Sequence, residues 1–250
     1  MRFLVGSLMG LLLALPGFGQ IQREYQYDVV PTENITSLEV NPSVTVVDNR
    51  GGISTSQLMF KGYRVINEHY NWGVEVPLAR YESPDKSVNG LGDTAVNATW
   101  VVPGINEHLG MGAKMEFFVP TATHKQLGSG KLQASPSAFV VWKFDNGIYV
   151  AGGYKHYVSL LGDNAREDIS YGRFRLNISY LSNDKWWIQT NAYYYQDFRH
   201  SGRTEFVPEV ELGTLVSQGT AFFINGTTHG GGNWKSRDWG LGVGFKVLYL

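Results

Sequence analysis

Seven charged residues stand within apolar stretches of the chain, six of them in pairs two positions apart. They are Lys114 with Glu116, Arg173 with Arg175, Glu209 with Glu211, and Lys155. Residues two apart in a β-strand point to the same face, so each pair charges one face and leaves the other apolar. Such a face can form a polar constriction that selects solutes by charge, or a salt-bridged plug. The residues alone leave both interpretations open.

The sequence gives little support for a catalytic site. His156 and Ser159 lie three positions apart, which in a strand places them on opposite faces. They are therefore poorly placed to share a proton as a hydrolase requires. The sequence also contains no G-x-S-x-G nucleophile motif. We expect no enzymatic activity, and a lipid hydrolase using His156 and Ser159 is the remaining enzyme hypothesis.

No metal, cofactor or nucleic-acid site is predicted. Cysteine is absent, and the six histidines are scattered without metal-ligand spacing. The run Gly128-Ser129-Gly130-Lys131 is similar to a phosphate loop, but Leu132 follows in place of Ser or Thr and no helix begins there. The net charge is −1 and no basic patch occurs, which argues against nucleic acid as a partner.

The elements that must position the charged residues are strands. Phe174, Leu176 and Ile178 alternate with polar residues, and the same pattern recurs as far as the end of the chain. Counting such segments predicts an all-β chain of about twelve strands, and a count of ten or fourteen stays open. The predicted strands are 37–47, 56–66, 72–80, 93–102, 109–119, 132–143, 147–159, 169–181, 185–197, 205–215, 219–225 and 237–250.

Short and long connections alternate between these strands. The long ones are expected at 48–55, 82–92, 121–131, 161–168, 200–204 and 226–237. Short turns on one rim and long loops on the other are typical of an outer-membrane β-barrel. In lipid such a sheet must close, with its apolar faces outward and its polar faces lining the lumen. Aromatic residues near strand ends fit the interfacial girdles, namely Trp72, Trp100, Trp142, Trp186, Trp239 and Tyr249.

Composition and the N-terminal segment support export. Only 17% of residues are charged and 30 are glycine, which is unusual for a soluble enzyme. Residues 1–19 read as a secretory signal peptide, because an arginine precedes an apolar core too short to span a bilayer comfortably. We expect an exposed leader over 20–34 and one barrel over 35–250. A soluble β-sandwich is the alternative, and the mid-strand charges argue against it.

Four short motifs are shared with a known family. They are Gly90-Leu91-Gly92-Asp93, Val119-Pro120-Thr121, Leu127 to Lys131, and Pro136-Ser137. With them the chain resembles the outer-membrane family named for the meta-pathway of phenol degradation, over about a fifth of its length. The resemblance implies an outer-membrane channel for aromatic or other hydrophobic compounds. One departure is that the chain ends Tyr249-Leu250, whereas such barrels usually end on an aromatic residue.

The sequence therefore predicts a transmembrane antiparallel β-barrel in the bacterial outer membrane, acting as a passive channel for small hydrophobic or aromatic solutes. We expect the seven charged residues to line the solute pathway, with Arg173 and Arg175 near Glu209 and Glu211 across Gln189, Asn191 and Tyr193. The outer mouth is predicted to involve Asp93, Pro120, Thr121, Gly128 and Gly130. Expected partners are outer-membrane lipid, the solute and the barrel assembly machinery during insertion. A closed structural or ligand-binding barrel without pore activity is the alternative.

Overall fold

A computed structural model describes residues 36–48, 51–102, 108–182, 185–200, 202–217 and 219–249. The predicted signal peptide and leader lie outside these residues. The strands are β1 (Thr36–Asp48), β2 (Ile53–Val65), β3 (Tyr70–Ser83), β4 (Lys86–Leu91), β5 (Thr94–Val102), β6 (Leu109–Val119), β7 (Lys131–Lys143), β8 (Ile148–Gly162), β9 (Ser170–Ser182), β10 (Trp186–Asp197), β11 (Thr204–Ser217), β12 (Thr220–Thr228), β13 (Gly231–Gly232) and β14 (Trp239–Tyr249). Within the described ranges, no helix is long and apolar enough to cross a membrane.

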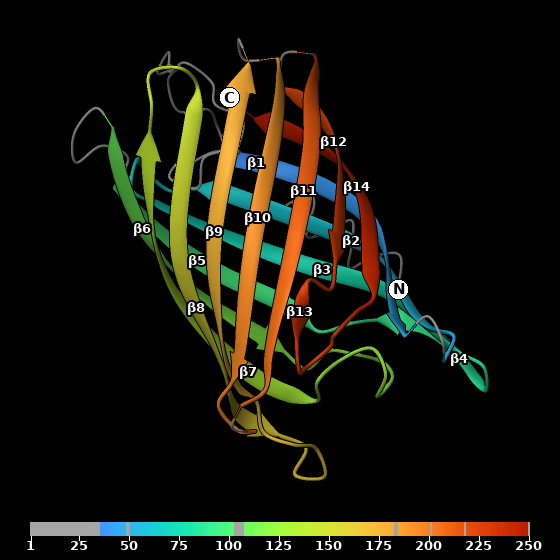
Figure 1. Ribbon diagram of the computed structural model, residues 1–250. Helices are drawn as coiled ribbons and strands as arrows, with labels where there is room; N and C mark the ends of the chain where they lie inside the picture. The colour runs from blue at the N-terminus through green and yellow to red at the C-terminus, as the bar shows by residue number, and fades with distance from the viewer. Residues whose placement is uncertain are drawn as a thin grey trace.

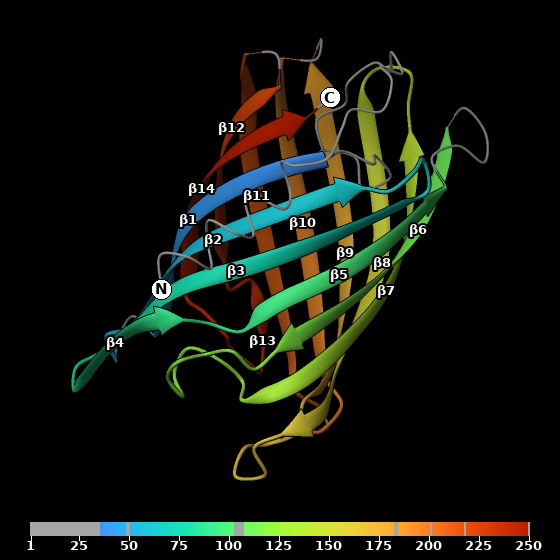
Figure 2. The same cartoon turned by 180° about the vertical axis from the view of Figure 1, so that it is seen from behind.

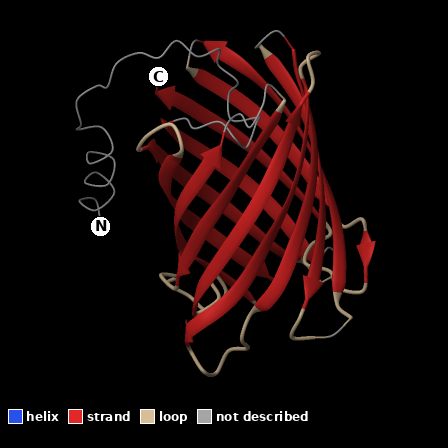
Figure 3. Ribbon diagram, turned by 90° about the vertical axis from the view of Figure 1, so that its left-hand side faces the viewer, coloured by secondary structure: helices blue, strands red, loops and turns tan. Residues whose placement is uncertain are grey.

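Twelve of these strands form a closed antiparallel barrel (Figures 1 and 2). Every barrel strand pairs with its neighbours, and β1 closes the ring against β14 with Thr36 opposite Tyr249 and Val46 opposite Trp239. The strands are tilted to the barrel axis, as closure of a sheet requires (Figure 3). The predicted all-β barrel of about twelve strands is confirmed. The two remaining strands, β4 and β13, pair with the long-loop ends of β3 and β11.

Long loops lie on one rim of the barrel and short turns on the other. Two of the predicted long loops differ in the structure: one is shorter, and one is largely a β-hairpin. Long loops cover 120–130, 163–169, 198–203 and 229–238 on one rim. The connection predicted at 48–55 comprises only residues 49–52, because β1 and β2 pair as far as Asp48 and Ile53. The segment predicted as a loop over 82–92 is mostly a hairpin of β3 with β4, which projects beyond the rim (Figure 2). Its two-residue turn is Pro84-Asp85, a pair with strong turn preference.

Apolar side chains face out of the barrel and polar side chains face in. On β9, Phe174, Leu176 and Ile178 are 49%, 50% and 48% exposed, whereas Asn177 and Ser179 between and beside them are 1% and 0% exposed. This exposed apolar band suits a bilayer, since closure has already paired the strand backbone. The predicted orientation of the alternating faces is therefore correct.

Outward tryptophans gather at the short-turn rim. Trp142 stacks on His108 at 5.9 Å between ring centroids, and Trp186 meets Tyr180 edge-on at 5.5 Å. Trp239 lies at the opposite rim, where it pairs with Val46 and Thr228. Rings at these positions fit the interfacial girdles of a membrane barrel.

An apolar cluster lies inside the barrel toward the short-turn end. Its members are Val141, Tyr149, Ala151, Leu181, Trp187, Ala221 and Phe223, all buried. The rings of Trp187 and Phe223 lie over Gly213 and Gly244, where any Cβ would overlap them. Glycine on the inward face therefore makes the space that these rings occupy.

Candidate functional site: the barrel lumen

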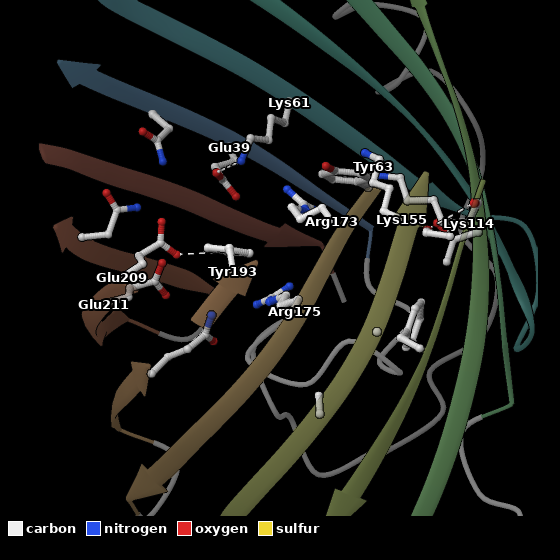
Figure 4. A pocket seen from close by; sticks show the side chains of 18 of the residues that line it. Glu39, Lys61, Tyr63, Lys114, Lys155, Arg173, Arg175, Tyr193, Glu209 and Glu211 are labelled. Atoms are coloured by element: carbon white, nitrogen blue, oxygen red, sulfur yellow. Dashed lines mark hydrogen bonds and ion pairs between the residues drawn. The ribbon is translucent and has the colours of Figure 1, made fainter. Parts of the chain in front are cut away.

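A cavity of about 530 Å³ occupies the middle of the lumen. Six of the seven predicted pathway residues line it, namely Lys114, Lys155, Arg173, Arg175, Glu209 and Glu211. The seventh, Glu116, lies behind two lysines that it pairs with. Figure 4 shows the two arginines pointing into the cavity, with Glu209 and Glu211 to one side and Lys114 and Lys155 to the other. The size suits a small organic molecule.

Four lumen lysines are neutralised by carboxylates. Glu39 pairs with Lys61 at 2.7 Å and with Lys246 at 3.2 Å, which joins β1, β2 and β14. Glu39, Lys61 and Lys246 were not among the predicted pathway residues, although Glu39 and Lys246 stand on predicted polar faces. Paired charges with good geometry are tolerated away from bulk water, so this cluster braces the wall.

The second ion-pair cluster continues from the first around the wall, since Glu75 on β3 is the cross-strand partner of Lys61 on β2. Glu116 pairs with Lys114 at 2.7 Å and also with Lys155. Glu75 lies 3.7 Å from Lys114 and accepts a 2.6 Å hydrogen bond from the Tyr63 hydroxyl. Three predicted pathway residues thus form one network with two that were not predicted.

The two arginines on β9 have neutral partners instead. The Arg175 Nε atom donates to Asn191 Oδ1 at 2.8 Å. The Arg173 guanidinium lies 5.2 Å from the ring centroid of Tyr193 and 5.9 Å from that of Tyr157. In the part of the chain that the structure describes, no carboxylate lies within 4.0 Å of either guanidinium.

Glu209 and Glu211 on β11 also have neutral partners. Glu209 accepts hydrogen bonds from Asn191 at 2.8 Å and from the Tyr193 hydroxyl at 3.2 Å. Glu211 accepts one from the Trp187 indole at 2.9 Å. The structure brings both charge pairs to the two sides of β10, as expected. The arginines and glutamates do not form the salt-bridged plug that was the alternative interpretation. Strand β10 lies between β9 and β11, and neighbouring strands are about 4.8 Å apart, so the two charge pairs are separated by two strand spacings.

An aromatic cluster lies toward the long-loop rim. Tyr157 stacks on Tyr171 at 4.4 Å between centroids. Trp234 contacts Tyr171 at 6.1 Å and Tyr195 at 6.3 Å. Both tyrosines stand on the strand faces that carry Arg173 and Tyr193, so loop 229–238 brings Trp234 against the lumen wall. Sequence reasoning missed this cluster, because alternation within a strand says nothing about where a loop packs.

The predicted outer-mouth residues come together around one carboxylate. Asp93 accepts hydrogen bonds from the Ser129 amide at 2.6 Å, the Ser129 hydroxyl at 2.8 Å and the Ala122 amide at 3.3 Å. The Thr121 hydroxyl donates to the Gly92 carbonyl at 2.9 Å. A Cβ on Gly128 would overlap Asp93, so this position requires glycine. Two motifs that are distant in sequence thus form one structural unit.

The remaining mouth residues contact the neighbouring loop. Gly130 adopts a φ of 69°, and its carbonyl accepts from the Asp163 amide at 3.0 Å. Pro120 is exposed at the end of β6. Arg166, which was not predicted, donates to the carbonyls of Gly128 at 2.6 Å and Lys125 at 3.0 Å. Loops 120–130 and 163–169 are therefore tied to each other.

An ion pair at the base of these loops strengthens that connection. Lys131 lies 3.0 Å from Asp168, and its hydrogen bond lowers the pKa of the Asp168 carboxyl.

The residues considered for catalysis lie apart. His156 pairs through Nδ1 with the Tyr154 hydroxyl at 3.0 Å, whereas the Ser159 hydroxyl accepts from the Ile169 amide at 3.0 Å. Their positions on opposite faces of β8 agree with the expectation from spacing. Across the described residues, no group of three or more His, Asp or Glu side chains is arranged to hold a metal ion.

The fold matches solved outer-membrane channels at low sequence identity. An outer-membrane channel from Pseudomonas putida F1 aligns with a TM-score of 0.67 and 11% identity, over 86% of this chain and 96% of that one. The KdgM porin aligns with a TM-score of 0.60 and 13% identity, over 86% and 99%. The CymD monoaromatic hydrocarbon channel aligns with a TM-score of 0.53 and 9% identity, over 88% and 90%.

No protein-family model and no curated protein sequence matches the chain. At identities this low, the structural similarity shows the fold, which is the antiparallel barrel of outer-membrane channels.

Proposed function

We propose that this protein is an outer-membrane channel through which small hydrophobic or aromatic solutes diffuse passively. The observation that carries the proposal is a polar cavity of about 530 Å³ enclosed by a barrel whose outer surface is apolar. An apolar exterior suits lipid, and a charged interior suits a selective aqueous passage. The N-terminal signal pattern supports export, with lipid and the barrel assembly machinery as the partners met on the way.

The aromatic solute class has three supports. Rings of Tyr63, Phe139 and Tyr193 line the cavity beside the charged groups. The motifs around Asp93 and Gly128 resemble the phenol meta-pathway family, which implies uptake of such compounds. One structural neighbour is a monoaromatic hydrocarbon channel.

The lumen would act on a solute in three successive layers. A solute passes the aromatic cluster near Trp234, then the belt of separated charges, and then the apolar cluster around Trp187 and Phe223. Apolar constrictions control passage by excluding water, and charged rings select by sign. The apolar cluster also favours the second candidate, a closed ligand-binding barrel, since its side chains are buried inside the barrel toward the short-turn end.

Planar-bilayer conductance of the refolded protein tests the proposal. We expect discrete steps, with Arg173→Ala shifting selectivity toward cations and Glu209→Ala shifting it toward anions. Arg80→Ala is the matched control, because Arg80 is exposed on the part of β3 that pairs with β4 and not with β5. Wild-type protein that is folded and inserted yet silent would contradict an open channel and support the closed barrel.

A further inference from the structure

We infer that Arg173 and Arg175 form a binding site for the carboxylate of a small ring-bearing organic acid. The inference rests on the proposed channel function for its physiological meaning, and it narrows the solute class from aromatic compounds in general to acids. It follows from the pairing of charges in the lumen.

The arginines differ from the lysines around the same cavity. Lys61, Lys114, Lys155 and Lys246 each have a glutamate partner. Arg173 and Arg175 have only neutral partners in the described chain, and the Arg173 Nε atom is buried without a hydrogen-bond acceptor. A guanidinium withdrawn from bulk water without a counter-ion is costly, so the site favours an anion.

The geometry suits a carboxylate. Arg173 and Arg175 project from the same face of β9, about 7 Å apart along the strand. Tyr193 lies opposite Arg175, and its ring centroid is 5.2 Å from Arg173 and 5.8 Å from Arg175. The ring therefore orients both guanidinium groups by cation–π contact. A planar guanidinium offers parallel donors that match the two oxygens of a carboxylate.

A relay of hydrogen bonds holds the site in place. Asn191 accepts from Arg175 and donates to Glu209, each at 2.8 Å. Tyr193 also donates to Glu209 at 3.2 Å. Glu209 thus fixes Asn191 and Tyr193, the two β10 side chains that position the arginines. Because β10 lies between Glu209 and the arginines, the glutamate charge does not neutralise the guanidinium groups. Fixed donors bind an anion with little loss of side-chain freedom.

The cavity has room for more than a carboxylate. At about 530 Å³ it accommodates a ring as well, and its lining includes Tyr63, Phe139 and Tyr193 near the charged groups. We assign the ring of the acid to these aromatic faces. Benzoate is the simplest probe, benzyl alcohol is a neutral compound with the same ring, and acetate is a carboxylate without one.

Calorimetric titration of the refolded full chain in detergent tests the site. We expect benzoate to bind, with acetate and benzyl alcohol each binding at least about tenfold more weakly, since one charged hydrogen-bonded contact is worth about that factor. Arg173→Gln and Arg175→Gln should each weaken benzoate by a similar factor. Lys246→Gln removes one positive charge from β14, four strands from β9 around the barrel, and should leave the affinity within about twofold.

Each alternative result overturns part of the inference. Equal weakening by Lys246→Gln would mean that general lumen charge, not an arginine site, attracts the anion. If benzyl alcohol binds as tightly as benzoate, the site does not recognise the carboxylate. If acetate binds as tightly as benzoate, the site does not recognise the ring. Arg173→Lys keeps the charge without the planar fork and should still lose affinity, which guards against a Gln variant that fails to fold.

Conductance separates this inference from the proposed function. An open channel that shows no arginine-dependent benzoate binding overturns the acid site alone. A silent barrel that binds benzoate through Arg173 and Arg175 overturns the channel and keeps the site.

Discussion

At the residue scale, a single carboxylate organises the outer mouth. Asp93 accepts three hydrogen bonds from residues 122 and 129 of loop 120–130, and it packs against Gly128. The sequence places Asp93 at the start of a predicted strand. The structure adds that the same residue anchors loop 120–130, which follows the second strand after it.

Replacing this carboxylate should loosen the loop. Asp93→Asn keeps the shape but loses the charge and one acceptor, so we expect local opening to become easier by about 1–2 kcal/mol. Trypsin cleavage after Lys125 in reconstituted protein should accelerate about tenfold, because cleavage follows the open population. Asp85→Asn in the exposed β3–β4 turn is the control. Unchanged cleavage in Asp93→Asn would show that the remaining contacts of the loop, those of Arg166 and Thr121, are enough to secure it.

At the element scale, loop 229–238 is folded toward the lumen. The Trp234 amide donates to the Thr204 carbonyl at 3.0 Å, and β13 pairs with Glu205 and Phe206 of β11. Glu205 is 1% exposed and accepts from the Ser236 amide at 2.9 Å. Backbone pairing and a buried carboxylate together hold the Trp234 ring against Tyr171 and Tyr195.

If the protein is a channel, this ring narrows it. Trp234→Ala should raise single-channel conductance, because the ring occupies space beside two lumen tyrosines. Trp239→Ala removes the same side chain from the outward face near the same rim, where Trp239 is 43% exposed, and should leave conductance unchanged. Equal conductance in wild type and Trp234→Ala would place the narrowest point elsewhere, with the apolar cluster around Trp187 as the next candidate.

At the scale of the whole molecule, an even strand number sets the sidedness. β1 begins opposite the end of β14, so the first and last strands share the rim of short turns. In an outer-membrane barrel that rim faces the periplasm and the long loops face outward. The absence of cysteine makes the sidedness directly measurable.

Single-cysteine labelling of intact cells tests this orientation. Lys125→Cys in loop 120–130 should react with a membrane-impermeant maleimide. Asp145→Cys in the turn after β7, where the side chain is 94% exposed, should react only after the outer membrane is opened. The reverse pattern would invert the assignment of the rims, and labelling of neither position in intact cells would argue against this membrane location.

The division between sequence and tertiary structure follows from the range of each interaction. Alternation is a local property, so the printed residues determine the strands, the outward apolar face and the inward position of Arg173, Arg175, Glu209 and Glu211. Turn chemistry at Pro84-Asp85 is also local, yet the strand pairing beyond it makes a hairpin where a loop was predicted.

Only the closed barrel decides which polar faces meet. Glu39 has Lys61 as a partner on the next strand along the chain, and it has Lys246 as a partner because β1, the first strand, closes against β14, the last. Arg175 and Glu209 stay apart because β10 lies between their strands, and this separation in space cannot be read from the sequence. The packing of Trp234 against the lumen wall and the hydrogen bonds between Asp93 and Ser129 likewise depend on how the loops pack against the barrel. Local periodicity thus determined the barrel and its lining, and long-range closure determined which charges are paired and which are left to a ligand.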